Sequence, residues 1–149
     1  MVDRKDIASW LEGPGGRRPG PEQAYAGERL GLPESGPGSV ASFGRRLAAV
    51  TVDWIASVLV ARAVTDDPWV PLLVFVVESL LLLPTLGATF GMRLLGLRVI
   101  RLGSPGLVPP LRAVVRTLLL AVVIPATIWD RDGRGLHDKA AGTVVVRAR

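Results

Sequence analysis

The 149-residue sequence lacks cysteine and has only one histidine, His137, and two lysines. Without cysteine the chain has no disulfide framework and no thiolate metal ligands, and one histidine alone does not make a zinc site. No serine or other nucleophile is paired with His137 in a pattern typical of hydrolases, and no G-x-G-x-x-G loop follows a strand. We therefore expect a protein that is not an enzyme and that holds no cofactor and no metal.

Basic residues outnumber acidic ones, 18 to 13, and almost all of them are arginine. These arginines flank apolar runs and do not form a patch with stacking aromatic side chains. The pattern favours a lipid bilayer with anionic headgroups as the partner of the arginines, and it argues against nucleic acid.

Residues 1–42 are polar and rich in glycine and proline, and no apolar signal-peptide core is visible at the start. Such a composition buries too little apolar surface to offset the cost of ordering the backbone. We expect a disordered cytoplasmic tail, in which Trp10 is either a docking anchor or part of a frayed terminus.

Two long apolar runs follow, over residues 44–64 and 69–89, joined by the polar turn TDDP. The first run gives about 31 Å of helix, enough to cross a hydrocarbon core of about 30 Å. The runs therefore predict an antiparallel transmembrane hairpin.

A third apolar run, residues 107–129, contains Arg112 and Arg116 one turn apart, and Pro125 near its end. Its uninterrupted part is too short to span a bilayer. The sequence favours an amphipathic or re-entrant third helix, with a third full crossing as the alternative.

The arginines also predict an orientation. Arg45 and Arg46 precede the first run, residues 90–116 hold five arginines, and the TDDP turn has neither lysine nor arginine. By the positive-inside rule we expect a multi-pass protein of the bacterial cytoplasmic membrane, with both termini cytoplasmic.

Two short β-branched segments bounded by glycine, residues 96–103 and 142–149, are expected to pair as a cytoplasmic ribbon. The expected fold is an all-α membrane protein: a transmembrane helical hairpin, a third amphipathic helix and a small two-stranded β-ribbon, within a membrane domain over residues 43–149.

Asp53 and Glu78 are the most notable polar residues inside the apolar runs. Counted from the TDDP turn, they lie at nearly equal depth, so they are candidates for a shared proton or cation. A structural role is the alternative, because Asp53 belongs to a stripe of small and polar residues with Ala49, Ser57 and Ala61 that suits close helix packing.

The candidate partners of these acids are arginines. Arg46 lies two turns before Asp53, too far for a direct pair, so we expect it to reach towards lipid headgroups. Asp53 would then meet Glu78 or one of three supporting arginines, Arg93, Arg112 and Arg116. Asp138, next to His137, is expected to hold backbone or an arginine of GMRLLGLR.

Three motifs in order, RRLAAVTVDW, TFGMRLLGLRVI and GLHDKAAGTVVV, make residues 43–147 similar to one family. Together they resemble the RDD family of small bacterial membrane proteins, named for an arginine and two aspartates. The matching trio is Arg46, Asp53 and Asp138. The chain departs from the family pattern at Phe90, where proline is usual, and at Met92, where lysine is usual.

The resemblance implies a membrane protein of poorly defined function, with cation/proton exchange proposed for some relatives. Our first hypothesis is a non-enzymatic accessory or scaffold subunit of a larger membrane complex, bound to other membrane protein subunits or to itself. The second is an oligomeric cation/proton transporter that uses Asp53 and Glu78.

Overall fold

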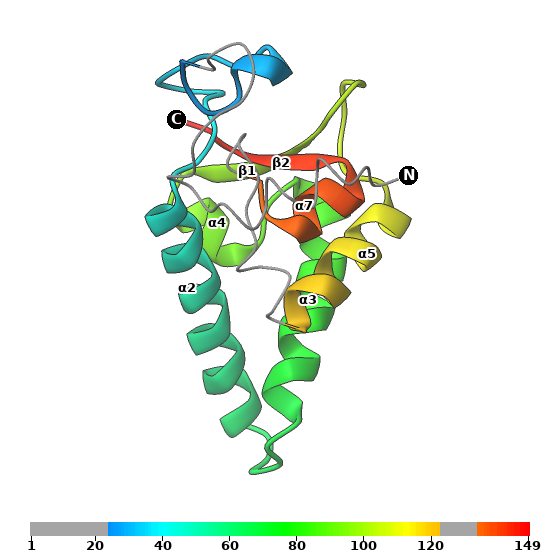
Figure 1. The fold of residues 1–149 in the computed structure, drawn as a ribbon. Coiled ribbons are helices and arrows are strands. Elements are labelled where there is room, and N and C mark those ends of the chain that lie inside the picture. The colour runs from blue at the N-terminus through cyan, green and yellow to red at the C-terminus, as the bar shows by residue number, and fades with distance from the viewer. Residues whose placement is uncertain (1–23, 123–133) are drawn as a thin grey trace.

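The computed structural model describes residues 24–122 and 134–149, which form a mixed fold of helices and one two-stranded sheet (Figure 1). A short 3-10 helix, η1, comes first. In chain order the elements are η1 (Glu28–Leu30), α2 (Phe43–Arg62), α3 (Val70–Leu86), α4 (Phe90–Leu94), β1 (Leu97–Arg101), α5 (Pro110–Ala121), α7 (Leu136–Ala141) and β2 (Thr143–Arg147).

Helices α2 and α3 form the predicted antiparallel hairpin, with the turn between them at the end far from the sheet (Figure 1). Each helix buries one stripe of residues spaced about four apart, as neighbouring turns of an α-helix require. The stripe of α2 is Arg46, Ala49, Asp53, Ser57 and Ala61, and that of α3 is Pro71, Phe75, Ser79 and Leu83. The small-residue stripe predicted on α2 is therefore confirmed as its packing face.

Strands β1 and β2 pair antiparallel, with Leu97 opposite Arg147 and Arg101 opposite Thr143, so the predicted ribbon is confirmed. Residues just before α2 lie along the outer edge of β2. The amide of Ala41 donates to the carbonyl of Val145, and the amide of Arg147 donates to the carbonyl of Ser39, both at 2.9 Å. Within the described part of the expected tail, residues 24–42, the backbone of Ser39 and Ala41 is therefore hydrogen-bonded to β2. Residues 1–23, with Trp10, lie outside the described residues.

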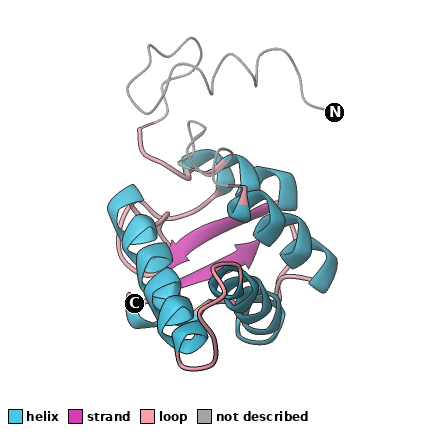
Figure 2. Ribbon diagram, turned by 90° about the horizontal axis from the view of Figure 1, so that it is seen from below, coloured by secondary structure: helices cyan, strands magenta, loops and turns pink. Residues whose placement is uncertain are grey.

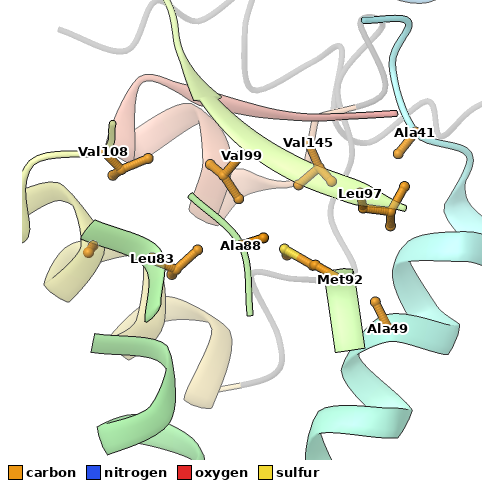
Figure 3. Packing of buried hydrophobic residues seen from close by; sticks show 10 residues of the cluster. Ala41, Ala49, Leu83, Ala88, Met92, Leu97, Val99, Val108 and Val145 are labelled. Atoms are coloured by element: carbon orange, nitrogen blue, oxygen red, sulfur yellow. The ribbon is translucent and has the colours of Figure 1, made fainter. Parts of the chain in front are cut away.

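The main apolar core lies between one face of the ribbon and the ends of the helices that approach it (Figures 2 and 3). The ribbon contributes Leu97, Val99 and Val145 to this core, and Leu83 and Met92 reach it from α3 and α4. The remaining members are Ala41, Ala49, Ala88, Val108 and Ala113. Residues from both ends of the described chain therefore meet in one core.

Within the described ranges, no helix is both long enough and apolar enough to cross a membrane. Helix α2 has 20 residues but contains charged side chains at Arg45, Arg46, Asp53 and Arg62, whereas the apolar α3 has only 17 residues. Helix α5 has 12 residues, and the predicted continuation to residue 129 lies outside the described part from 123 onward.

The prediction of an all-α, multi-pass protein of the cytoplasmic membrane is wrong on this finding. The predicted orientation and location depended on two membrane crossings and do not stand without them. The error has a physical origin: the second apolar run ends at Gly87, which adopts a left-handed backbone conformation (φ 71°) and closes α3. The next two residues, Ala88 and Thr89, then lead into α4 and add nothing to the length of α3.

Candidate functional site

A buried cluster of charge joins three helices beneath the ribbon. The Nε of Arg116, on α5, donates to Oδ1 of Asp138, on α7, at 2.8 Å. Arg46, on α2, places Nη1 at 3.5 Å from the other oxygen of Asp138. Asp138 is completely buried, and both arginines are almost so. Two cations thus share one carboxylate inside the molecule.

The arginines keep Asp138 ionised. Burial by itself raises the pKa of this carboxyl, but Arg116, His137 and Arg46 together outweigh burial, and the pKa of Asp138 is lowered. His137 lies beside Asp138, with its Nε2 at 3.5 Å from Oδ2. Burial, reinforced by Arg116 and Arg46, lowers the pKa of His137 to about 4 against the attraction of Asp138. The imidazole is therefore neutral at pH 7.

The same cluster anchors the ribbon. Nη2 of Arg46 donates to the carbonyl of Val145 at 3.4 Å, and the hydroxyl of Thr143 lies 3.4 Å from Oδ1 of Asp138. Arg112, one turn before Arg116, donates to the carbonyl of Ala141 at the end of α7, at 3.3 Å. These contacts attach both ends of α7 and the strand β2 to α2 and α5.

Two sequence predictions about this cluster are corrected by the structure. Arg46 does not reach towards lipid headgroups, because its side chain is buried against Asp138. Asp138 holds arginines from α2 and α5, and not an arginine of GMRLLGLR, since Arg93 and Arg98 are both exposed. The RDD resemblance had grouped Arg46 with Asp138, and it was the only signal in the sequence for this contact.

Asp53 and Glu78 meet at the start of α4. The hydroxyl of Thr89 donates to Oδ2 of Asp53 at 2.6 Å, and the amide of Gly91 donates to Oδ1 at 2.5 Å. The amide of Phe90 donates to Oε1 of Glu78 at 3.0 Å. Two carboxylates from neighbouring helices thus bind consecutive amides at one helix N-terminus, where negative charge is favourable.

The two carboxyl groups also interact with each other. Burial raises the pKa of Asp53, against the lowering effect of Thr89, Gly91 and Glu78. Burial also raises the pKa of Glu78, and the charge of Asp53 and a hydrogen bond between the two side chains raise it further. The pair can therefore share one proton. Asp53 faces Glu78 and α4, and Arg116 acts on it only through its charge.

Gly91 brings the backbones of α4 and α2 into contact. A Cβ atom built on Gly91 would lie 2.1 Å from the carbonyl oxygen of Ala49 and 3.0 Å from Oδ1 of Asp53. Backbone atoms cannot move aside as a flexible side chain can, so only glycine fits here. This close approach allows the carboxylate of Asp53 to reach the α4 amides.

The outer faces of the hairpin are apolar. Exposed large apolar side chains run along α2 and α3 and across the turn between them: Phe43, Leu47, Trp54, Ile55, Leu59, Val60, Val64, Trp69, Leu73, Val77, Leu81 and Leu86. Trp69 is 74% exposed and Leu59 67%. Exposed apolar side chains gathered on one part of a protein are typical of binding surfaces.

Comparisons with protein-family models, with curated proteins and with solved structures found no match to this chain. The resemblance to the RDD family accordingly stays a prediction carried by the three sequence motifs.

Proposed function

We propose that this chain is a non-enzymatic accessory subunit that joins a larger assembly through the apolar outer faces of α2 and α3. The observation that carries the proposal is the concentration of exposed apolar side chains on this hairpin. Burying them against a partner protein supplies the main driving force for association.

Two features favour a protein as the covering partner. Trp54 and Trp69 are exposed on the hairpin, and tryptophan is enriched at the residues that contribute most to protein interfaces. On α3, Leu73, Val77 and Leu81 form one exposed stripe with a four-residue spacing, the pattern that a helix presents to a groove or to another helix.

The charge clusters fit an accessory role because they hold the hairpin to the ribbon. Asp138 is engaged by Arg46 and Arg116, and the oxygens of Asp53 and Glu78 accept hydrogen bonds from the start of α4. We assign the carboxylate pair to positioning α4. We do not extend the proposal to cation/proton transport.

Affinity purification of the full chain from its native cells, followed by quantitative mass spectrometry, tests the proposal. The wild-type chain should recover one set of partner proteins in fixed stoichiometry. The double substitution Leu73→Gln and Leu81→Gln should reduce this recovery at least about tenfold, because it places polar amides in an apolar interface. Glutamine and leucine have similar helix propensity, so α3 itself should persist.

The matched control is Leu111→Gln with Leu118→Gln, on the exposed face of α5. This variant should recover the partners as the wild-type chain does. Recovery of the wild-type chain alone would contradict the accessory role. Equal loss in both double variants would show that the hairpin is not the specific contact.

A further inference from the structure

A second surface, at the end of α3 beside the ribbon, combines a cavity with positive charge. A cavity of about 570 Å³ lies beside β1, between the end of α3 and the loop that follows the strand. Arg98 and Arg101 contribute to its lining from β1, Ser104 from the loop, and Leu86 and Leu107 from its apolar side. Its size suits a small organic ligand.

The two arginines of this cavity have no acidic partner among the residues that the structure describes. From residue 79 onward, Asp138 is the one acid in the described ranges, and Arg46 and Arg116 already engage it. The Nε of Arg101 is buried without a hydrogen-bond acceptor. A buried guanidinium donor of this kind is normally satisfied, so Nε of Arg101 is available to an acceptor that the described residues do not supply.

We propose that this cavity binds an organic phosphate with an apolar group attached. The planar guanidinium group of Arg101 matches phosphate oxygens in shape and charge, and the Ser104 hydroxyl is a further donor. Arg98 lies on the opposite face of β1 and adds positive charge at the edge of the cavity. The half-exposed Leu86 and Leu107, with Pro105, form the apolar side against which an alkyl group packs. This site shares Leu86 with the apolar surface of the hairpin proposed above, whereas its arginines and its loop belong to the cavity alone.

Isothermal titration of the full chain with inorganic phosphate and with hexyl phosphate tests the site in solution. Hexyl phosphate should bind at least about tenfold more tightly than inorganic phosphate, because its methylene groups leave water. Arg101→Gln should weaken the binding of hexyl phosphate at least about tenfold, the range expected for loss of a charge-assisted hydrogen bond. Arg101→Lys keeps the positive charge but removes the Nε donor. Its affinity for hexyl phosphate should therefore lie between that of the wild-type chain and that of Arg101→Gln.

The matched control is Arg93→Gln, which removes the same charge from an exposed arginine outside the cavity. This control should bind hexyl phosphate within about twofold of wild type. Circular dichroism of each variant checks that the fold is kept. Cosedimentation with phosphatidylcholine vesicles, with and without phosphatidic acid, shows whether a lipid headgroup also fills the site.

If hexyl phosphate binds in the titration and Arg101→Gln weakens this binding, the ligand of the cavity is a free phosphate ester. If the chain binds vesicles that contain phosphatidic acid and Arg101→Gln weakens that binding, the ligand is a lipid headgroup. Binding of neither probe at millimolar concentration would overturn the proposal. Equal weakening by Arg93→Gln and Arg101→Gln would also overturn it, because general attraction between charges would then explain the result.

Discussion

At the scale of the residue, two buried guanidinium groups share one buried carboxylate. Asp138 contacts Arg116 at 2.8 Å and Arg46 at 3.5 Å, and all three side chains are shielded from water. A buried ion pair adds little net stability over an apolar replacement, but removal of one partner leaves the other charge without compensation. The contribution of Asp138 therefore shows most clearly when it alone is neutralised.

Asp138→Asn should lower the free energy of unfolding by about 3–5 kcal/mol, because Arg46 and Arg116 then remain buried without a counter-charge. Urea denaturation followed by circular dichroism measures the change. The control is Asp66→Asn, which breaks the exposed pair between Asp66 and Arg62 and should leave the unfolding midpoint unchanged. Equal midpoint shifts in the two variants would contradict the assigned role of Asp138.

Some residue contacts were predictable from the sequence and others were not. The equal depth of Asp53 and Glu78 followed from the constant rise of two helices counted from one turn, and the two carboxyls do meet. The contact between Arg46 and Asp138 depends on how α7 docks against α2, across 92 positions of the chain. No local spacing carries that information.

At the scale of the element, α4 is a helix of five residues held in place from outside. So short a helix is not stable alone, because nucleation costs more than its few hydrogen bonds return. Its N-terminus is bound by Asp53 and Glu78, and Gly91 lets it lie against the backbone of α2. The position of α4, and the start of β1 after it, therefore depend on this junction.

Gly91→Ala should destabilise the fold by about 2 kcal/mol or more, because the added methyl group overlaps the Ala49 carbonyl and forces α4 away from α2. Gly44→Ala is the matched control, since a Cβ atom at Gly44 in the first turn of α2 meets nothing within 4 Å. That control should be neutral, or stabilising by up to about 1 kcal/mol. Thermal unfolding of both variants measures the difference in stability. An unchanged Tm for Gly91→Ala would contradict the close contact between α4 and α2.

The elements themselves were partly predictable. Apolar runs around a polar turn located the hairpin, and glycine-bounded β-branched segments located the ribbon. The membrane interpretation failed because counting apolar residues treats a run as one helix. It could not register that Gly87 closes α3, that Arg46 pairs with Asp138, or that Asp53 accepts hydrogen bonds from the start of α4.

At the scale of the whole molecule, the two charge clusters give stability opposite dependences on pH. His137 has a pKa lowered in the folded state, so its contribution is present above about pH 6.5 and is lost as the pH falls towards about 4. Asp53 and Glu78 have raised pKa values, so their protonation on acidification favours the folded state.

The histidine contribution can be isolated by comparing the wild-type chain with His137→Gln. Relative to this variant, the wild-type chain should lose about 2 kcal/mol of unfolding free energy as the pH falls from about 7 to about 5. Over this range His137 takes up a proton in the unfolded chain but stays neutral where it is buried in the folded chain. Urea titrations at a series of pH values measure the difference. A constant difference across this range would show that His137 titrates normally in the folded chain.

The carboxylate pair has its own comparison in Glu78→Gln, which keeps an oxygen for the amide of Phe90. Relative to this variant, the wild-type chain should lose stability as the pH rises through the raised pKa of Glu78. The stability difference between the wild-type chain and His137→Gln should therefore rise with pH, whereas the difference between the wild-type chain and Glu78→Gln should fall. Parallel slopes in the two series would contradict the assignment of the clusters.

The pairing of Arg46 with Asp138 also has a consequence for the order in which the chain can fold as it is made. Synthesis proceeds from the amino terminus, so α2, α3 and α5 leave the ribosome before Asp138, the anion that both Arg46 and Arg116 contact. Strand β2, which closes the core, follows Asp138 within a few residues. Until Asp138 is made, Arg46 on α2 and Arg116 on α5 therefore lack the carboxylate that they contact in the folded chain, and that interval is when a partner or chaperone would be needed most.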